Sequence, residues 1–163
     1  MSRESERESI PLRRESVNVG VLLELTTEVM QRQARTLGVT LSIIIDDDVP
    51  DAVHLDRDKV AWAITSLVGS ALRHVRTPGG RIDVRVSYDV GRAILSIAVR
   101  DDGPGIPADR LERLLKRGSW QPGAALALLL VEDVAVAHRG RVEVESSNDR
   151  LEHFTKISVT IPA

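Results

Sequence analysis

The residues best suited to chemistry lie in the short run Asp101-Asp102-Gly103-Pro104-Gly105-Ile106-Pro107. Two adjacent carboxylates are followed by two glycines and two prolines, so the backbone has to turn sharply and cannot stay regular there. A carboxylate accepts hydrogen bonds, and glycine lets the backbone come close to a ligand. The combination is suited to binding an amino group on a flat ring, although a surface turn with solvated acids has the same composition.

Neighbouring segments must position this run. Within residues 93–99, large apolar side chains recur at every second position, at Leu95, Ile97 and Val99, which predicts a strand leading into it. Residues 108–116 predict a short helix leaving it. Residues 81–88 alternate polar and apolar side chains and predict a second strand. Asp89-Val90-Gly91-Arg92 predicts a hairpin turn between the two strands.

Longer helices are predicted on both sides of these strands. Asp56 can cap a helix that runs to about Val75, because the apolar residues of that segment recur on one helical face. The other predicted helices cover residues 21–37, ending at Gly38, and residues 124–138, ending at Gly140. Further strands are predicted at residues 39–45, 141–146 and 155–161.

The order of these elements indicates the fold class. Strands and helices come in runs rather than in strict alternation, which predicts an α+β two-layer sandwich: a mixed sheet with helices on one face. The domain is expected to cover residues 17–163. Residues 1–16, dominated by Ser, Glu and Arg, are expected to be a flexible leader or linker.

Composition narrows the classes of function. The chain has 163 residues, 42% of them hydrophobic, which is enough for one domain with one core. A net charge of -2 and 2% aromatic residues give no reason to expect nucleic acid as a partner. The sequence has no cysteine, no long apolar run and a charged N-terminus, so we expect a cytoplasmic protein without direct membrane contact.

Three segments together resemble a known family. Residues 101–107 resemble the first glycine box of the ATP-binding domain of sensor histidine kinases. Residues 55–82 resemble the helix that carries the asparagine box, and residues 131–146, with His138-Arg139-Gly140, resemble the usual end of the domain. The same fold occurs in type II topoisomerases, heat-shock chaperones and mismatch-repair ATPases. The resemblance covers residues 17–162.

The resemblance implies roles for particular residues. It assigns to Asp101 the acceptance of a hydrogen bond from the adenine amino group, and to Gly103 and Gly105 the close approach of the backbone to the ring. It implies that Arg73 lies near the phosphates and that His74 flanks the adenine. Such a site would bind ATP with Mg²⁺ as cofactors.

On the phosphate side the chain departs from the family pattern. Ser70 stands where the family has the asparagine that ligates Mg²⁺, and its hydroxyl lies nearer the backbone than an amide oxygen would. We therefore expect it to fall short of the metal or to need a bridging water. In the second glycine box only Gly123 remains, followed by the helix-forming residues 124–129. We expect that helix to begin near Ala124 and the preceding lid to be short.

The resemblance implies an ATP-binding domain that positions ATP for phosphoryl transfer to a histidine on a separate dimerisation domain. Its partners would be that domain, or a response regulator, and the adenine nucleotide. The departures at Ser70 and Gly123 favour an alternative: a catalytically inactive module with weak or no nucleotide binding that acts by protein–protein contact. Ser70 also argues against a partner-switching serine kinase of the same fold.

Overall fold

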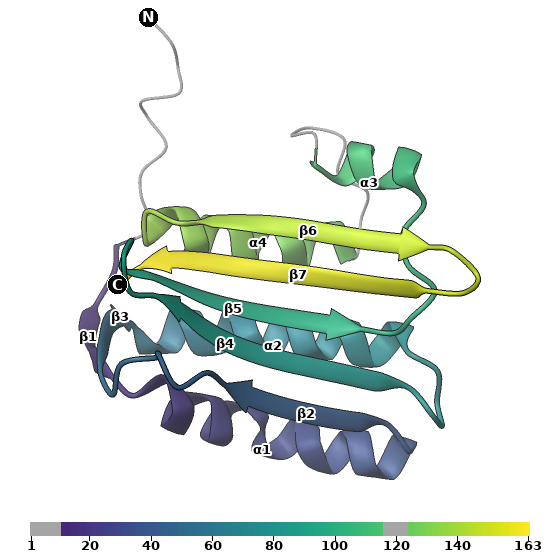
Figure 1. Ribbon diagram of the computed structural model, residues 1–163, viewed down its shortest axis with the longest axis horizontal. Coiled ribbons are helices and arrows are strands. Elements are labelled where there is room, and N and C mark those ends of the chain that lie inside the picture. The colour runs from purple at the N-terminus through teal and green to yellow at the C-terminus, as the bar shows by residue number, and fades with distance from the viewer. Residues whose placement is uncertain (1–10, 116–123) are drawn as a thin grey trace, which may run out of the picture.

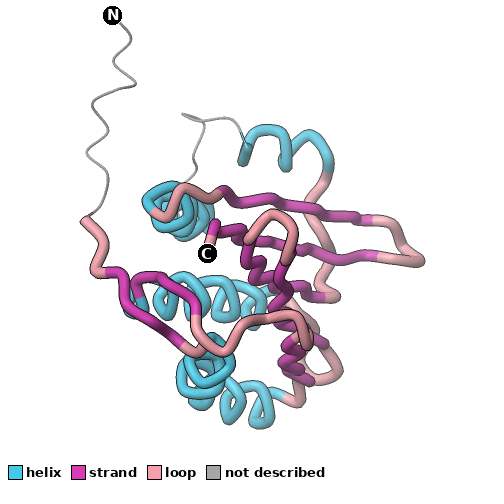
Figure 2. The backbone as a smooth tube through the Cα atoms, turned by 60° about the vertical axis from the view of Figure 1, so that its left-hand side comes forward, coloured by secondary structure: helices cyan, strands magenta, loops and turns pink. Residues whose placement is uncertain are grey.

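The computed structural model describes residues 11–115 and 124–163. Its elements are, in chain order, β1 (Arg14–Val17), α1 (Val19–Leu37), β2 (Thr40–Ile45), β3 (Val53–Asp56), α2 (Arg57–His74), β4 (Arg81–Asp89), β5 (Ile94–Asp101), α3 (Ala108–Leu115), α4 (Ala124–Ala137), β6 (Arg141–Asn148) and β7 (His153–Pro162). Helices α1, α2 and α4 cover one face of a single large sheet (Figure 1), and the turned view of Figure 2 shows the same two layers. The predicted α+β two-layer sandwich is confirmed.

The large sheet has the strand order β2-β4-β5-β7-β6. β2 and β4 run parallel and the other neighbouring pairs run antiparallel, so the sheet is mixed as predicted. A parallel pair needs a crossover connection, which α2 supplies. The register places Asp101 opposite Ile82 of β4 and Thr155 of β7.

Strand β5 carries the alternation that brings a carboxylate to the helix side of the sheet. Leu95, Ile97 and Val99 are 0%, 2% and 3% exposed, and they face the helices. Because side chains on one face of a strand recur every second residue, the next residue of this series is Asp101. The carboxylate therefore continues the core-facing row instead of pointing to solvent.

Helix α2 matches the prediction at both ends. The Asp56 carboxylate accepts a hydrogen bond from the Lys59 N–H at 3.1 Å, and the helix ends at His74 with Val75 as its C-cap. Six apolar residues are buried along one face: Val60, Ala63, Ile64, Leu67, Val68 and Ala71. This face packs between the sheet and the helices on either side, α1 and α4.

The other two long helices also agree with the sequence. Helix α1 starts two residues before the predicted position because Asn18 accepts a hydrogen bond from the Val21 N–H, and Gly38 ends it in the left-handed conformation at a φ of 70°. Helix α4 begins at Ala124, which confirms that expectation. Within the described part of the chain, none of the helices has the length and apolar composition that crossing a membrane requires.

A small second sheet was not predicted. β1 pairs antiparallel with β3, so that Arg14 lies opposite Asp56 and Val17 opposite Val53. The Arg13 N–H donates to the Asp56 carboxylate at 2.9 Å. The predicted boundary at residue 17 thus falls at the end of a paired strand, and residues 14–16 of the expected leader belong to that strand.

His138 joins the end of α4 to the start of α2. Its side chain is 1% exposed, its Nδ1 donates to the Val134 carbonyl at 2.8 Å, and its Nε2 accepts from the Asp56 N–H at 3.0 Å. Burial lowers the pKa of His138 below its ordinary value, and the charges of Arg14 and Lys59 act in the same direction, while the Val134 carbonyl and the Asp56 carboxylate oppose the shift. The imidazole is therefore held neutral, as the acceptor role of Nε2 requires.

Candidate functional site

Asp101 ends β5 as a buried carboxylate, 8% exposed. Its Oδ1 accepts a hydrogen bond from the Gly103 N–H at 2.9 Å. Among residues 11–115 and 124–163, no group donates a hydrogen bond to its Oδ2. Burial raises the pKa of Asp101 above its ordinary value, and the Gly103 N–H and the charge of His74 oppose that shift without cancelling it. The side chain thus combines one fixed oxygen with one acceptor left for a ligand.

Gly103 lies where three elements meet. A Cβ at this position would be 2.8 Å from the Asp101 Oδ1 and 3.0 Å from the carbonyl oxygen of His74, at the end of α2. Neither distance leaves room for a side chain without movement of the neighbour. Glycine at this position therefore allows close contact between two protein segments, and its predicted approach to an adenine ring stays a prediction.

Gly105 and Ile106 attach the glycine box to the β6–β7 hairpin. Gly105 has a φ of +76°, and a Cβ there would lie 1.9 Å from the Ser147 carbonyl oxygen, so both conformation and space demand glycine. The Ile106 N–H donates to the Ser146 Oγ at 2.7 Å, and that hydroxyl donates to the Phe154 carbonyl at 3.0 Å. The turn after Asp101 is therefore held by the hairpin.

The predicted residues on α2 lie on its last two turns. Ser70 is half-buried and His74 is exposed, and the His74 Nδ1 lies 2.7 Å from the Ser70 carbonyl oxygen, to which it can donate. Arg73 is exposed and lines a groove of about 610 Å³ between α1 and α2, together with Val29 and Leu72. The structure thus places Arg73 on the α1 side of the helix, away from His74.

A solvent-open cleft of about 550 Å³ lies beside the glycine box. His74, Gly103 and His153 line it, with residues of the loop after α2 and of the β6–β7 turn, and Asp101 and Ser70 do not. Figure 1 shows why these parts meet: the ends of α2, β5 and β6 and the start of β7 all lie at one end of the molecule. The cleft brings His74 and Gly103 together, whereas Arg73 faces elsewhere.

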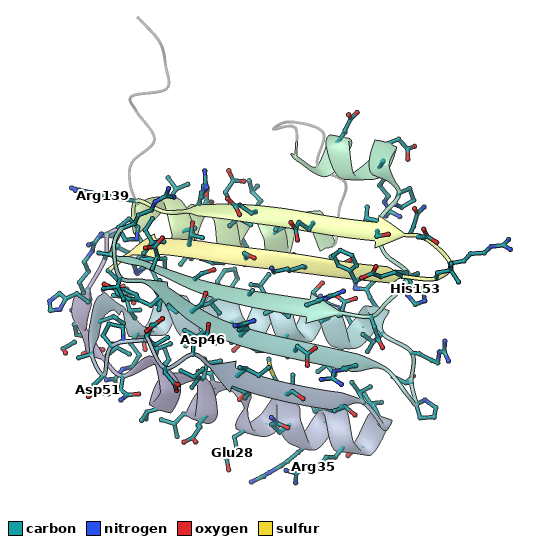
Figure 3. The ribbon with its side chains drawn as sticks, in the orientation of Figure 1. Glu28, Arg35, Asp46, Asp51, Arg139 and His153 are labelled. Atoms are coloured by element: carbon teal, nitrogen blue, oxygen red, sulfur yellow. The ribbon has the colours of Figure 1, made fainter. Side chains whose placement is uncertain are left out.

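Three features remain: Asp102, which is the second carboxylate of the run, Gly123, and the acidic turn before β3. Asp102 is exposed, and its Oδ1 accepts a hydrogen bond from the Arg81 N–H at 2.9 Å, so it fastens the ends of β4 and β5. Gly123 and the expected short lid lie outside the described residues. In the turn, Asp46 forms two hydrogen bonds of 3.1 Å with the Arg85 guanidinium, and Figure 3 labels it near the middle of the sheet.

The described residues do not form a metal site by themselves. They contain no cluster of three or more His, Cys, Asp or Glu side chains that could hold an ion. Protein sites for Mg²⁺ usually supply one or two carboxylates in addition to substrate phosphates. Ser70 offers one neutral hydroxyl oxygen, so this donor set does not fit Mg²⁺ without other ligands.

Two contacts on the glycine box were missed by the sequence analysis. The His153 Nδ1 donates to the Gly103 carbonyl at 2.7 Å, and the Ser146 Oγ accepts from the Ile106 N–H, as described above. The only signal for either was the prediction of two strands at the end of the chain. The pairing of β7 with β5, and of β6 with β7, brings residues 40 to 50 positions apart into contact.

Comparisons with known proteins agree with this geometry. A family model described as "Histidine kinase-, DNA gyrase B-, and HSP90-like ATPase" matches residues 55–163. The alginate biosynthesis sensor protein KinB of Pseudomonas aeruginosa is 32% identical over 77% of this chain and 22% of its own length. The sensory histidine kinase/phosphatase NtrB of Rhizobium leguminosarum bv. phaseoli is 31% identical over 94% of this chain and 42% of its own. The chain thus spans less than half the length of either relative.

Solved structures show the same fold. Full-length ShkA in complex with AMPPNP superposes with a TM-score of 0.79 at 22% identity, covering 94% of this chain and 32% of that one. The catalytic domain of histidine kinase ThkA superposes with a TM-score of 0.77 at 18% identity, covering 93% and 97%. The family model covers most of the chain, including the whole segment from α2 through the glycine box to β7. The chain belongs to the histidine kinase-, DNA gyrase B- and HSP90-like ATPase family.

Proposed function

We propose that this chain is the ATP-binding domain of a sensor histidine kinase. It holds ATP by its adenine and presents the terminal phosphoryl group to a histidine on a separate dimerisation domain, in the cytoplasm. The observation that carries the proposal is the Asp101 carboxylate, buried on the helix side of the sheet with Oδ2 as an acceptor that no described residue occupies. It is supported by the functions of KinB, a sensor protein, and NtrB, a sensory histidine kinase/phosphatase, and by the AMPPNP in the ShkA structure.

The chemistry of Asp101 explains a preference for adenine. An ionised carboxylate only accepts hydrogen bonds, so Oδ2 attracts the exocyclic amino group of adenine and repels the carbonyl oxygen at the same place on guanine. The Gly103 N–H occupies Oδ1 and so holds the carboxylate in one orientation. Burial strengthens the discrimination, because a polar group that loses its partner away from water is costly.

The phosphate side is less complete. In this proposal Ser70 and His74 face the nucleotide from the last two turns of α2, and Arg73 supplies positive charge after a change of rotamer from the groove that it now lines. The Ser70 hydroxyl can donate to a phosphate oxygen, but it does not by itself make a magnesium site. This feature favours one second candidate, an inactive module that keeps the adenine pocket and acts through contact with a dimerisation domain or response regulator.

Isothermal titration calorimetry separates the two candidates. We expect ATP to bind at micromolar concentration, more tightly with Mg²⁺ than without, and GTP to bind much more weakly. Asp101→Asn should abolish most of the affinity, whereas the matched control Asp102→Asn should keep it. Binding of ATP that is unaffected by Mg²⁺ would favour the inactive module. If neither nucleotide binds at millimolar concentration, the proposed nucleotide-binding function is wrong.

A further inference from the structure

Both backbone polar groups of Gly103 are engaged by side chains from other elements. Its N–H donates to the Asp101 Oδ1 at 2.9 Å, and its carbonyl accepts from the His153 Nδ1, which lies 2.7 Å away. His153 is the first residue of β7, half-buried, and Figure 3 labels it at the end of the sheet. The imidazole and the buried carboxylate thus bind the two peptide units that flank the Cα of Gly103, one at its carbonyl and the other at its N–H.

The position of Gly103 depends on these two hydrogen bonds. Gly103 has no side chain of its own, so the two hydrogen bonds and the His74 carbonyl oxygen beside it determine its position. Without His153, the carbonyl would lose its partner and the peptide unit between Gly103 and Pro104 could rotate. Because glycine has no side chain to limit φ and ψ, the adjoining unit that carries the Gly103 N–H would lose a restraint as well. The Gly103 N–H would then no longer fix Oδ1, and the orientation of Oδ2 toward a ligand would be lost.

The Gly103 carbonyl also determines that the Nδ1 of His153 carries a proton. A carbonyl oxygen accepts only, so the His153 Nδ1 must carry a proton, either in the Nδ1–H tautomer or in the imidazolium form. Both forms donate at Nδ1. The contact therefore does not depend on the charge of His153, and an asparagine can replace it, because the asparagine amide nitrogen lies at a position similar to Nδ1.

We propose that His153 is a positioning residue for adenine recognition: acting through Gly103, it fixes the Asp101 carboxylate and so determines the preference for an amino over an oxo purine. This inference rests on the proposed function, since it concerns the same pocket. It adds a residue that belongs to neither the glycine boxes nor the asparagine box. A purely structural role for His153 in fastening the hairpin would affect stability but not the choice of purine.

Four variants test the proposal. His153→Ala removes the donor, His153→Gln moves it to a position similar to Nε2, and His153→Asn keeps it near Nδ1. Leu151→Ala is the matched control, because this side chain is 97% exposed in the same hairpin turn. We expect the Ala and Gln variants to bind ATP about three- to tenfold more weakly, as for the loss of one hydrogen bond, with a smaller ATP-over-GTP ratio. The Asn and control variants should match the wild type.

The outcomes distinguish this inference from the proposed function. Equal ATP affinity in all His153 variants, or an equal loss in Ala, Gln and Asn with an unchanged ATP-over-GTP ratio, would overturn the positioning role. If the wild type binds no adenine nucleotide, the proposed function fails instead. In that case, hydrogen exchange of the Gly103 amide, measured without nucleotide, tests whether His153 holds Gly103 in place. Faster exchange in His153→Ala than in His153→Asn supports it, and equal exchange refutes it.

Discussion

Replacing Asp101 by asparagine should move stability and nucleotide affinity in opposite directions. Burial raises the pKa of the Asp101 carboxyl, so the folded state holds that proton more tightly than the unfolded state does. Above the folded pKa, where the group is ionised in both states, its charge therefore costs folding free energy, and this cost shrinks as the pH falls from the folded pKa to the unfolded pKa. Asparagine carries no charge, and its Oδ1 can still accept from the Gly103 N–H.

The affinity should fall because the amide places an NH₂ group where Oδ2 was. The variant loses a hydrogen bond to a charged acceptor, worth about 1.5–3 kcal/mol. In its place, the NH₂ group of asparagine faces the amino group of adenine, and both groups are donors. At about 1.4 kcal/mol per factor of ten, ATP should bind roughly 10- to 150-fold more weakly. The unfolding midpoint should be equal to or higher than that of the wild type at pH 7, and the difference should shrink in acid as Asp101 of the wild type becomes neutral.

Calorimetry with ATP and urea denaturation at several pH values measure both effects on the same samples. Asp102→Asn is the control, because Asp102 is exposed and its replacement can still accept from the Arg81 N–H. The reasoning would be refuted by an Asp101→Asn variant that binds ATP as tightly as the wild type. The reasoning would also be contradicted if the stability of the variant, relative to that of the wild type, were clearly lower at pH 7 than in acid.

Three further predictions concern other positions. The folded pKa of His138 lies below its ordinary value of 6.5, so the free energy of unfolding should fall as the pH drops from that value toward the folded pKa; His138→Gln, which keeps an acceptor for the Asp56 N–H, should flatten this dependence in urea titrations. Gly105→Ala should strongly reduce the yield of folded protein, because its Cβ would lie 1.9 Å from the Ser147 carbonyl oxygen, whereas Gly69→Ala, with nothing within 4 Å, should lower neither the yield nor the unfolding midpoint. Ser70→Asn should increase the effect of Mg²⁺ on ATP affinity, measured by calorimetry with and without the metal, and an unchanged effect would show that Ser70 is not the defect.

Much of the fold could be predicted because its signals are local. The alternation of β4 and β5, the apolar face of α2 and the cap at Asp56 depend on residues within one element, and all three are confirmed. The β1–β3 pair could not be predicted in the same way. Its strands have four residues each and lie about forty positions apart, so pairing across the fold defines them rather than any periodicity of their own.

The same distinction applies to the site. The sharp turn at Asp101 and the two glycines could be predicted because the box is a contiguous motif, whereas their role toward a nucleotide stays a prediction. The contact of His153 with Gly103 could not, because it joins residues 50 positions apart through the register of β5 with β7. The position of Arg73 also could not be predicted, because helical spacing places a side chain on a face but does not choose its rotamer.

The core-facing row of β5 makes the position of the Asp101 carboxylate sensitive to insertions and deletions within this strand. The same changes in the β4–β5 turn are tolerated. Removing a single residue between Ile97 and Asp101 would turn the carboxylate to the opposite face of the sheet, because side-chain direction reverses at every residue. The β4–β5 turn lies about 24 Å away at the other end of β5. Changes of length in that turn leave the strand pairing in place, so variation among related chains should accumulate there, while the count of residues from Leu95 to Asp101 stays constant.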